Sequence, residues 1–166
     1  MENKMDVVLR DSHHSDLPFL KKMLYEAVFW RAGPNTPSFQ EGLAYPEVGK
    51  QLADWGERHG DTAVVATIKS IPVGAAWVRF WTNVDSVRGF VDENTPVLVI
   101  GVHRDYRRQG IGKAMMEWLI DYASKHHIQQ ISLCVSKDNY ALNLYRQTGF
   151  VEHEDVGHSF NMVRQI

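Results

Sequence analysis

The chain has 166 residues, 44% of them hydrophobic, and a formal net charge of −2 at pH 7. These values predict a single domain, residues 1–166, with a sizeable hydrophobic core. A charge so close to zero gives no field that would attract nucleic acid or an anionic membrane, so we expect neither as a partner. The lone cysteine, Cys134, rules out an internal disulfide and suits a reducing compartment. Because the sequence shows no signal peptide and no membrane-length apolar run, we expect a cytoplasmic protein.

The first half of the chain predicts short strands and two helices. Ser15-Asp16-Leu17-Pro18 has the form of a helix start, with proline in the first turn. Residues 31–49 contain several prolines and glycines without a sustained period, which predicts a loop broken by short turns. A second helix is expected from Glu47 to His59. Apolar and β-branched runs predict strands at Val7–Arg10, Ala63–Ile68 and Pro72–Trp81.

A strand, a turn and a helix follow one another between residues 97 and 125. Val97–Val102 is short and rich in β-branched residues, which is typical of a strand buried on both faces. After the turn, from near Gly112, apolar residues recur at helical spacing. No Ser, Thr, Asp or Asn caps this helix, so its first backbone N–H groups lack an acceptor at the positive end of the helix dipole. The junction therefore predicts a site for a phosphate-bearing ligand.

The turn also has the composition of an anion site. Gly110 and Gly112 let the backbone approach a ligand without a Cβ, and Arg107, Arg108 and Lys113 supply positive charge. A nucleoside-triphosphate loop is excluded, because its first glycine is replaced by Arg107 and no Ser or Thr follows Lys113. A dinucleotide fingerprint, and with it an oxidoreductase, is a weaker alternative, because it would need a small residue at Met115, although Asp138 lies at a tolerable distance for a ribose contact.

The remaining sequence alternates strands and helices. A strand from Gln130 to Val135 precedes a helix from Asn139 to Gln147, and two closing strands are expected at Phe150–Asp155 and Ser159–Arg164. Antiparallel strands followed by a strand-helix-strand crossover predict an α/β (α+β) fold. Its central sheet should be mixed and mostly antiparallel, with helices on both faces.

Two stretches resemble motifs of the GCN5-related N-acetyltransferase (GNAT) family. The segment Val97 to Met116, with Arg-Arg-Gln-Gly-Ile-Gly at residues 107–112, is similar to that family's acetyl-coenzyme-A-binding motif. The segment Asn139 to Tyr145, followed by Gly149-Phe150, is similar to its later motif of Asn, Ala, Leu-Tyr and Gly-Phe. The two motifs occur in the family's order, and the resemblance implies the fold predicted above.

The resemblance also implies which residues hold acetyl-CoA. In that family two parallel strands, here ending at Val102 and Val135, diverge, and the pantetheine arm hydrogen-bonds between them. Its amides can satisfy backbone groups exposed where the strands part. Asn139 would hold the arm from the other side, although it could equally be a helix N-cap. The expected cofactor-binding residues are Ile100 and Val102 for the arm, Arg107, Arg108, Gln109, Gly110, Ile111, Gly112 and Lys113 for the pyrophosphate, and Asn139.

Tyr145 is the predicted general acid. When an amine attacks a thioester, the departing thiolate gains a proton, and a phenol placed at the sulfur can supply it. The resemblance places that acid at Tyr145. The alternative is a half-buried aromatic side chain that packs beside Leu142, three residues earlier on the same helix face.

The general base is where the sequence departs from the family. Many members carry Glu on the strand before the cofactor turn, whereas this chain has Val97 there. An alkyl amine has a pKa of about 10.4, so presenting it neutral at pH 7 costs about 4.6 kcal/mol without a base. Glu93 is a weak candidate because it lies in the connection 82–96, and long connections are often functional. The other candidates are Asp92, Glu41, Asp54 and Glu57.

Other conspicuous residues indicate little chemistry. The pairs His13-His14 and His126-His127 lack the i, i+4 spacing of metal ligands on a helix, so we expect no metal site. Trp77, Arg79 and Trp81 share one face of a strand. We expect core packing with Arg79 at the surface, the alternative being an acceptor pocket with Arg79 as a carboxylate anchor.

The sequence thus predicts an acetyl-CoA-dependent N-acetyltransferase in which the acceptor amine attacks the thioester directly. The acceptor would be a small-molecule amine or an amine of a protein or peptide. Its identity, a longer acyl donor and a homodimer are left open. The alternative is a non-catalytic acyl-CoA sensor or complex subunit, which the missing carboxylate at Val97 would explain.

Overall fold

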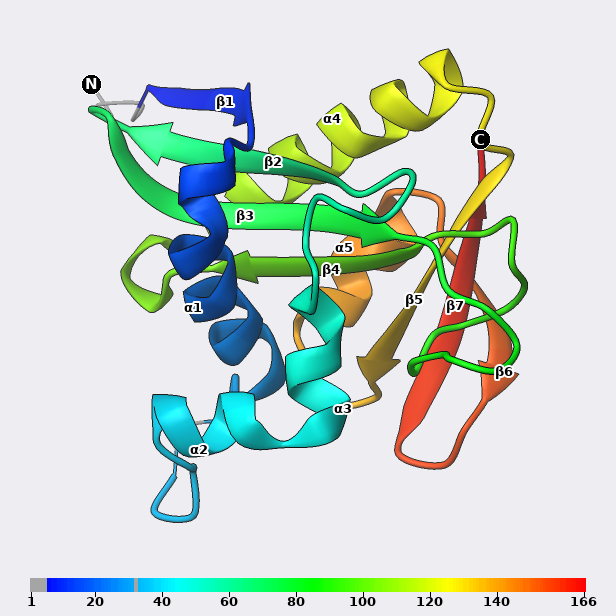
Figure 1. Cartoon of the computed structure of the whole chain (residues 1–166), viewed down its shortest axis with the longest axis horizontal. Coiled ribbons are helices and arrows are strands. Elements are labelled where there is room, and N and C mark those ends of the chain that lie inside the picture. Colours follow the sequence, from blue (N-terminus) through cyan, green and yellow to red (C-terminus); the bar gives the residue numbers. More distant parts are fainter. Residues whose placement is uncertain (1–5, 32) are drawn as a thin grey trace.

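The structure is a computed structural model and describes residues 6–31 and 33–166. Its centre is a seven-stranded sheet in the order β1-β2-β3-β4-β5-β7-β6 (Figure 1). The strands are β1 (Val7–Asp11), β2 (Thr62–Ile68), β3 (Ile71–Arg79), β4 (Val97–Val102), β5 (Gln130–Ser136), β6 (Val151–Asp155) and β7 (Ser159–Gln165). Strands β1 to β4 are antiparallel neighbours, β4 and β5 are parallel, and β7 is antiparallel to both β5 and β6. The predicted mixed, mostly antiparallel sheet is confirmed.

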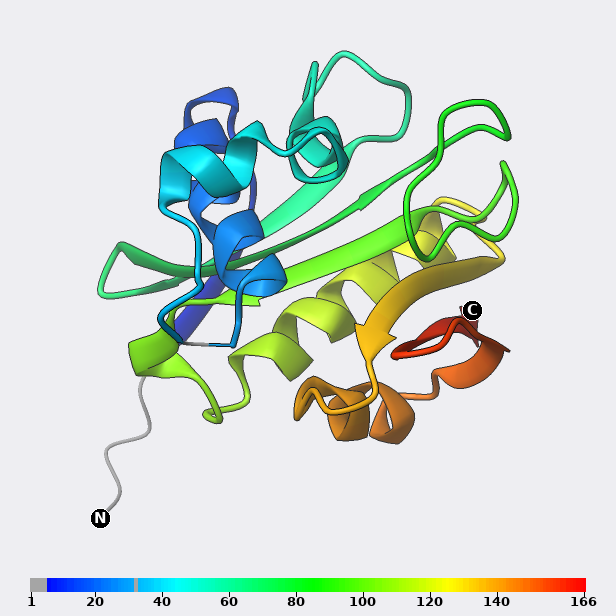
Figure 2. The same cartoon turned by 90° about the horizontal axis from the view of Figure 1, so that it is seen from below.

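Helices cover both faces of the sheet, as predicted. Figure 2 shows one face covered by α1 (Leu17–Val28), α2 (Phe39–Ala44) and α3 (Pro46–Gly49), and the other by α4 (Ile111–Lys125) and α5 (Ala141–Gln147). Each layer encloses its own apolar cluster. The larger one lies under α4 around Met115, Leu119 and Met162, and the other lies under α1 around Leu24 and Trp77. The sheet between the two clusters explains why β2 and β3 are buried along nearly their whole length.

A close contact fixes α1 against β4. A Cβ built at Gly101 would lie 2.3 Å from the backbone oxygen of Met23, so only glycine permits this approach. The helix packs mainly on β4, and its side chains Leu20, Met23 and Leu24 are buried. The C-terminal turn of α1 is thereby held beside the end of β4.

The connection between α1 and β2 differs from the prediction. The helix expected from Glu47 to His59 is wrong: α3 ends at Gly49, and a 3-10 turn, η2 (Lys50–Leu52), follows it. The helix α2, which was expected to be loop, begins at a capping box in which Ser38 accepts from Glu41 N and Glu41 accepts from Ser38 N. That Ser-x-x-Glu signal is readable in the sequence.

Arg79 binds the backbone at the point where the expected second helix has ended, before the left-handed residues Asp54 and Gly56. Its side chain is 1% exposed and forms a two-pronged ion pair with Asp61, at 2.8 and 2.9 Å. The same guanidinium donates to the carbonyl oxygen of Ala53 at 2.7 Å and to that of Gln51 at 3.3 Å. These carbonyls are therefore bound by a distant strand instead of by helical N–H groups. The expected surface position of Arg79, and its alternative role in an acceptor pocket, are both wrong.

Candidate functional site

The two parallel strands at the centre of the sheet separate soon after they meet. β4 and β5 pair at Val97 and Ser132, where Ser132 N donates to Pro96 O at 3.1 Å. Backbone groups on a strand face alternate edges, so the edge that carries Pro96 O also carries the polar groups of Ile100 and Val102. No pairing between β4 and β5 is recorded beyond Val97 in the described part of the chain. The backbones of Ile100 and Val102 therefore border the gap.

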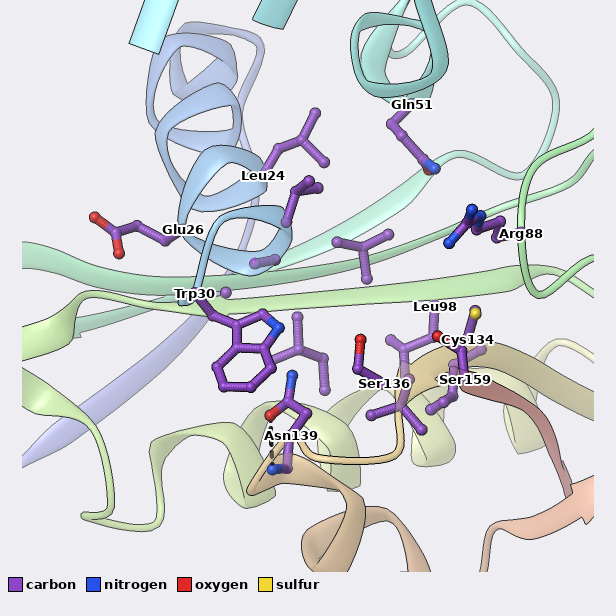
Figure 3. A pocket seen from close by; sticks show the side chains of 18 of the residues that line it. Leu24, Glu26, Trp30, Gln51, Arg88, Leu98, Cys134, Ser136, Asn139 and Ser159 are labelled. Atoms are coloured by element: carbon purple, nitrogen blue, oxygen red, sulfur yellow. Dashed lines mark hydrogen bonds between the residues drawn. The ribbon is translucent and has the colours of Figure 1, made fainter. Parts of the chain in front are cut away.

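A cavity of about 410 Å³ crosses the sheet at this gap (Figure 3). On the α1 face its walls include Leu24, Val48 and Gln51, and on the opposite face they include Ala141 and Tyr145. A second cavity of about 220 Å³ lies at the N-terminus of α4. The two share wall residues of β4 and α5, so together they form one passage from the start of α4 to the α1 face.

The start of α4 has the geometry of an anion site. The helix begins at Ile111, close to the predicted start, and no side chain caps it. Gly110 precedes it with φ +81°, a left-handed conformation that favours glycine. A Cβ added at Gly112 would face Leu144 at 3.4 Å, so this position opens onto the second cavity. The first N–H groups of α4 are thus free for an acceptor, as the sequence predicts.

The cations around this helix start divide into two groups. Arg108 and Lys113 line the second cavity; Arg108 lies over the Tyr140 ring, and Lys113 is 4.0 Å from exposed Glu117. Arg107 is already paired, because it donates to Glu26 at 2.9 Å and to Val102 O at 3.1 Å. Gln109 is exposed in the turn and does not line either cavity. Among the described residues, positive charge at this site without a close carboxylate partner therefore comes from Arg108 and from the helix end.

Tyr145 lies where the two cavities join. It lines both of them, and its ring packs edge-to-face against Phe150 with centroids 5.9 Å apart. Burial, with a smaller contribution from Tyr140, raises the pKa of the Tyr145 phenol above its ordinary value. A phenol with a raised pKa keeps its proton at neutral pH, which is the state that a general acid needs.

Asn139 contacts the start of α5 and also lines the larger cavity. Its side-chain oxygen accepts from Ala141 N at 2.9 Å at the start of α5, which is a helix-capping contact. The residue also lines the cavity and lies directly below Trp30 in the view of Figure 3. With the oxygen engaged by the helix, the amide nitrogen is the group left to donate to a ligand.

Carboxylates of the cavity wall are not those that the sequence nominated. Glu93 is exposed in the connection between β3 and β4, accepts from Asn83 N at 3.2 Å, and does not line either cavity. Two other carboxylates do line the larger cavity, Glu26 and Glu47. Glu26 is held by Arg107, whereas no ion pair of Glu47 is recorded among the described residues.

Sequence reasoning missed a polar end of the cavity. Gln51, Arg88, Cys134 and Ser159 meet there, although they come from η2, the β3–β4 connection, β5 and β7 (Figure 3). Cys134 is half-buried on the wall, and burial raises the pKa of its thiol, which Ser159 and Arg88 partly offset. The length of the connection 82–96 was the sequence feature that could have indicated this end of the cavity. It was used to nominate Glu93, whereas the residue of this connection at the polar end is Arg88.

The described part of the chain contains neither a metal-binding cluster nor a membrane-spanning helix. Within residues 6–31 and 33–166, no three His, Cys, Asp or Glu side chains lie in an arrangement that could hold a metal ion. No helix in the same ranges is both long and apolar enough to cross a membrane.

Comparison with known proteins identifies the family. The sequence model of the Acetyltransferase (GNAT) family matches residues 25–150, which is most of the chain. The chain therefore belongs to the GNAT family of acetyltransferases, and the resemblance inferred from the two motifs is confirmed. A comparison with curated proteins found no match.

Solved structures share the fold at low sequence identity. PaiA N-acetyltransferase from Thermoplasma acidophilum, in complex with coenzyme A, is 17% identical, with a TM-score of 0.71 over 98% of this chain and 100% of that one. Ribosomal-protein-alanine N-acetyltransferase from Brucella melitensis is 21% identical, with a TM-score of 0.69 over 96% and 99%. YncA from Salmonella typhimurium, with its cofactor acetyl-CoA, is 20% identical, with a TM-score of 0.66 over 96% and 93%.

Proposed function

We propose that this protein is an N-acetyltransferase that uses acetyl-CoA to acetylate a primary amine. The observation that carries the proposal is the passage through the sheet between β4 and β5. One end is an uncapped helix start suited to the pyrophosphate, and the other opens under α1 and α3. A donor and an acceptor entering from opposite faces would meet at the gap, which favours direct transfer.

The residues that would hold acetyl-CoA fit its chemistry. The free N–H groups at Ile111 and Gly112, with Arg108, suit the pyrophosphate. The backbones of Ile100 and Val102 suit the pantetheine amides, because both border the gap. When bound, acetyl-CoA supplies an activated acyl group as a thioester. The predicted contact of Arg107 with phosphate is a different case, because the Arg107 guanidinium donates to Glu26 in this structure. That contact remains a prediction.

Transfer requires one proton to leave the amine and one to reach the departing sulfur. The amine nitrogen forms a bond to the acyl carbon, and the carbon–sulfur bond breaks with its electron pair on sulfur. Tyr145 is the proposed donor of the proton to sulfur, because it lines both cavities and its phenol carries a proton at neutral pH. The phenolate is then reprotonated from solvent.

Glu47 is the carboxylate best placed to receive the proton from the amine. It lies on α3, lines the acceptor side of the cavity and is exposed enough to exchange protons with water. Glu93, the earlier candidate, stays a prediction, but its hydrogen bond to Asn83 N and its place outside the cavity wall do not favour it. Delivery through water would let Glu47 act without direct contact.

Release of free CoA thiol from acetyl-CoA tests the proposal. The assay uses amines, amino acids, aminoglycosides and peptides with free N-termini, and mass spectrometry identifies the acetylated product. Turnover with any amine above the hydrolysis rate supports the enzyme. Tight binding of acetyl-CoA by calorimetry without turnover on the whole panel would instead support the non-catalytic acyl-CoA sensor or complex subunit.

A further inference from the structure

The polar end of the large cavity presents an arginine that no carboxylate of the described chain neutralises. Arg88 lies in the connection between β3 and β4 and is exposed, and its guanidinium points into the cavity toward Gln51 (Figure 3). No ion pair or side-chain hydrogen bond of Arg88 is recorded within residues 6–31 and 33–166. The chain next to Arg88 lies against that wall, since a Cβ built at Gly89 would lie 2.9 Å from Cys134 N.

Arg88 differs from the other arginines by its place on the cavity wall. Arg79 is paired with Asp61, Arg107 with Glu26 and Arg146 with Glu152. Among the arginines for which no ion pair is recorded in the described ranges, Arg88 is the one that lines the large cavity. Carboxylates near Arg88 along the chain are also engaged, since Asp85 pairs with Lys50 at 3.1 Å. An arginine side chain directed into a cavity without a protein partner has five N–H donors available for a ligand.

The position of Arg88 assigns it to the acceptor and not to acetyl-CoA. It lines the large cavity but not the cavity at the start of α4, where the pyrophosphate is proposed to bind. The two ends of the passage thus each carry positive charge. At the Arg88 end, the side chains of Gln51, Ser159 and Cys134 add further polar groups to the wall. About 410 Å³ must hold the acyl end of the donor as well as the acceptor, so the acceptor is small or a chain terminus.

We propose that the acceptor is an amine that also carries a carboxylate, and that Arg88 binds this carboxylate. The planar guanidinium matches a carboxylate in a two-pronged contact. Glu47, on the same cavity wall, would face the amine of such a zwitterion. A free amino acid and a short acidic peptide both present this chemistry. The inference rests on the proposed function, because it names the substrate class of that site.

Matched acceptors test the proposal. Amino acids are each compared with their own carboxamide, and peptides with Asp in position two are compared with the same peptides containing Asn. For each pair, the ratio of kcat/KM for the carboxylate to kcat/KM for the amide is measured in wild type, Arg88→Gln and Arg88→Glu. Comparing this ratio between proteins cancels the different basicity of the two amines.

We expect Arg88→Gln to lower the ratio by about 10- to 100-fold, the effect of losing a charge-assisted contact. Arg88→Glu should lower it further by repulsion. Arg58→Gln is the control, because Arg58 stacks on Trp81 and lies outside the cavity wall, so the ratio should stay at the wild-type value. If the ratio falls for the amino acids, the carboxylate is that of a free amino acid. If it falls for the peptides, the carboxylate is an acidic side chain of a peptide. Equal ratios in wild type and Arg88→Gln overturn the assignment of Arg88.

A measurement without turnover separates this proposal from the proposed function. Cys134 lies at the same end of the cavity, and alkylation of its thiol by iodoacetamide is followed by mass spectrometry. Carboxylates should protect Cys134 in wild type more than their amides do, and Arg88→Gln should abolish the difference. If no amine is acetylated but this protection is seen, the transferase fails and the anion site stands. If no carboxylate-dependent protection is seen in wild type, the anion site is overturned even when turnover is present.

Discussion

At the scale of single residues, the proposed role of Tyr145 as general acid depends on the protonation state of its phenol. Its phenol lies at the junction of two cavities, and burial raises its pKa. Because the raised pKa lies above the ordinary value, the phenol is protonated throughout the neutral and moderately alkaline range. Turnover therefore should not fall between pH 7 and about 10, the ordinary pKa of tyrosine, through loss of the Tyr145 proton.

Tyr145→Phe should lower turnover by roughly 10²-fold, because removing a general acid costs about that much. Affinity for acetyl-CoA should change little, since the ring and its packing on Phe150 are retained. Steady-state kinetics and calorimetry measure the two effects, and Tyr122→Phe on α4 controls for loss of a phenol outside the cavities. Turnover equal to wild type would leave Tyr145 as a packing residue.

The choice of base predicts a pH profile. If no residue accepts the proton, kcat/KM for an alkyl amine should rise tenfold per pH unit toward the pKa of the free amine. If Glu47 accepts it, the profile should bend at a lower pH, and Glu47→Gln should remove the bend without altering affinity for acetyl-CoA. Glu93→Gln is the matched comparison. A bend that survives Glu47→Gln but disappears in Glu93→Gln would restore the original candidate.

At the scale of elements, the site depends on the junction of β4 with α4. The strand delivers Ile100 and Val102 to the gap, and the helix begins without a side-chain cap after a left-handed glycine. A ligand anion would accept from the N–H groups that no side chain caps, and it would interact favourably with the positive end of the helix dipole. Binding energy for the donor should therefore depend on its phosphates as much as on its acyl end.

Gly112→Glu should abolish acetyl-CoA binding, because its side chain would enter the second cavity from the first turn of α4 and place a negative charge beside the pyrophosphate. Gly112→Ala is the control for size, since the added Cβ meets only Leu144 at 3.4 Å and Ile100 at 4.0 Å. Calorimetry measures affinity, and circular dichroism checks that both variants fold. Wild-type affinity in Gly112→Glu would contradict the anion site.

At the scale of the whole molecule, a buried ion pair links the core to the acceptor side of the cavity. Asp61 and Arg79 are each 1% exposed, and Arg79 also binds the carbonyls that follow α3. This pair holds in place the segment that carries Gln51, while Glu47 lies one helical turn before it. Stability and the shape of the acceptor end are therefore set by the same two residues.

Asp61→Ala should lower the free energy of unfolding by about 3 to 5 kcal/mol, because it leaves a buried guanidinium without its counter-ion. Urea denaturation measures the loss. Glu152→Ala is the surface control: it removes a half-exposed ion pair with Arg146 and should cost less than about 1 kcal/mol. The double variant Asp61→Leu/Arg79→Met should recover part of the loss. A cost for Asp61→Ala no larger than that of Glu152→Ala would show that the pair is not a major contributor.

The sequence alone was sufficient for features that depend on neighbouring residues. The β-branched run of β4, the uncapped start of α4 and the motif around Tyr145 are each local patterns, and the mixed sheet with its family followed from them. Helix starts and strand periods are set by backbone hydrogen bonding and side-chain direction within a few residues. The one missed helix, α2, also had a local capping signal.

Tertiary structure decided what depends on contacts between distant residues. Arg79 binds the segment that follows α3 because Asp61 and the core, not its sequence neighbours, determine where its guanidinium lies. Glu47 of α3 and Arg88 of the β3–β4 connection line the same cavity. Glu26 forms an ion pair with Arg107, which lies 81 positions away in the sequence. No spacing rule covers such meetings, since packing and charge pairing bring them about only after the chain has folded.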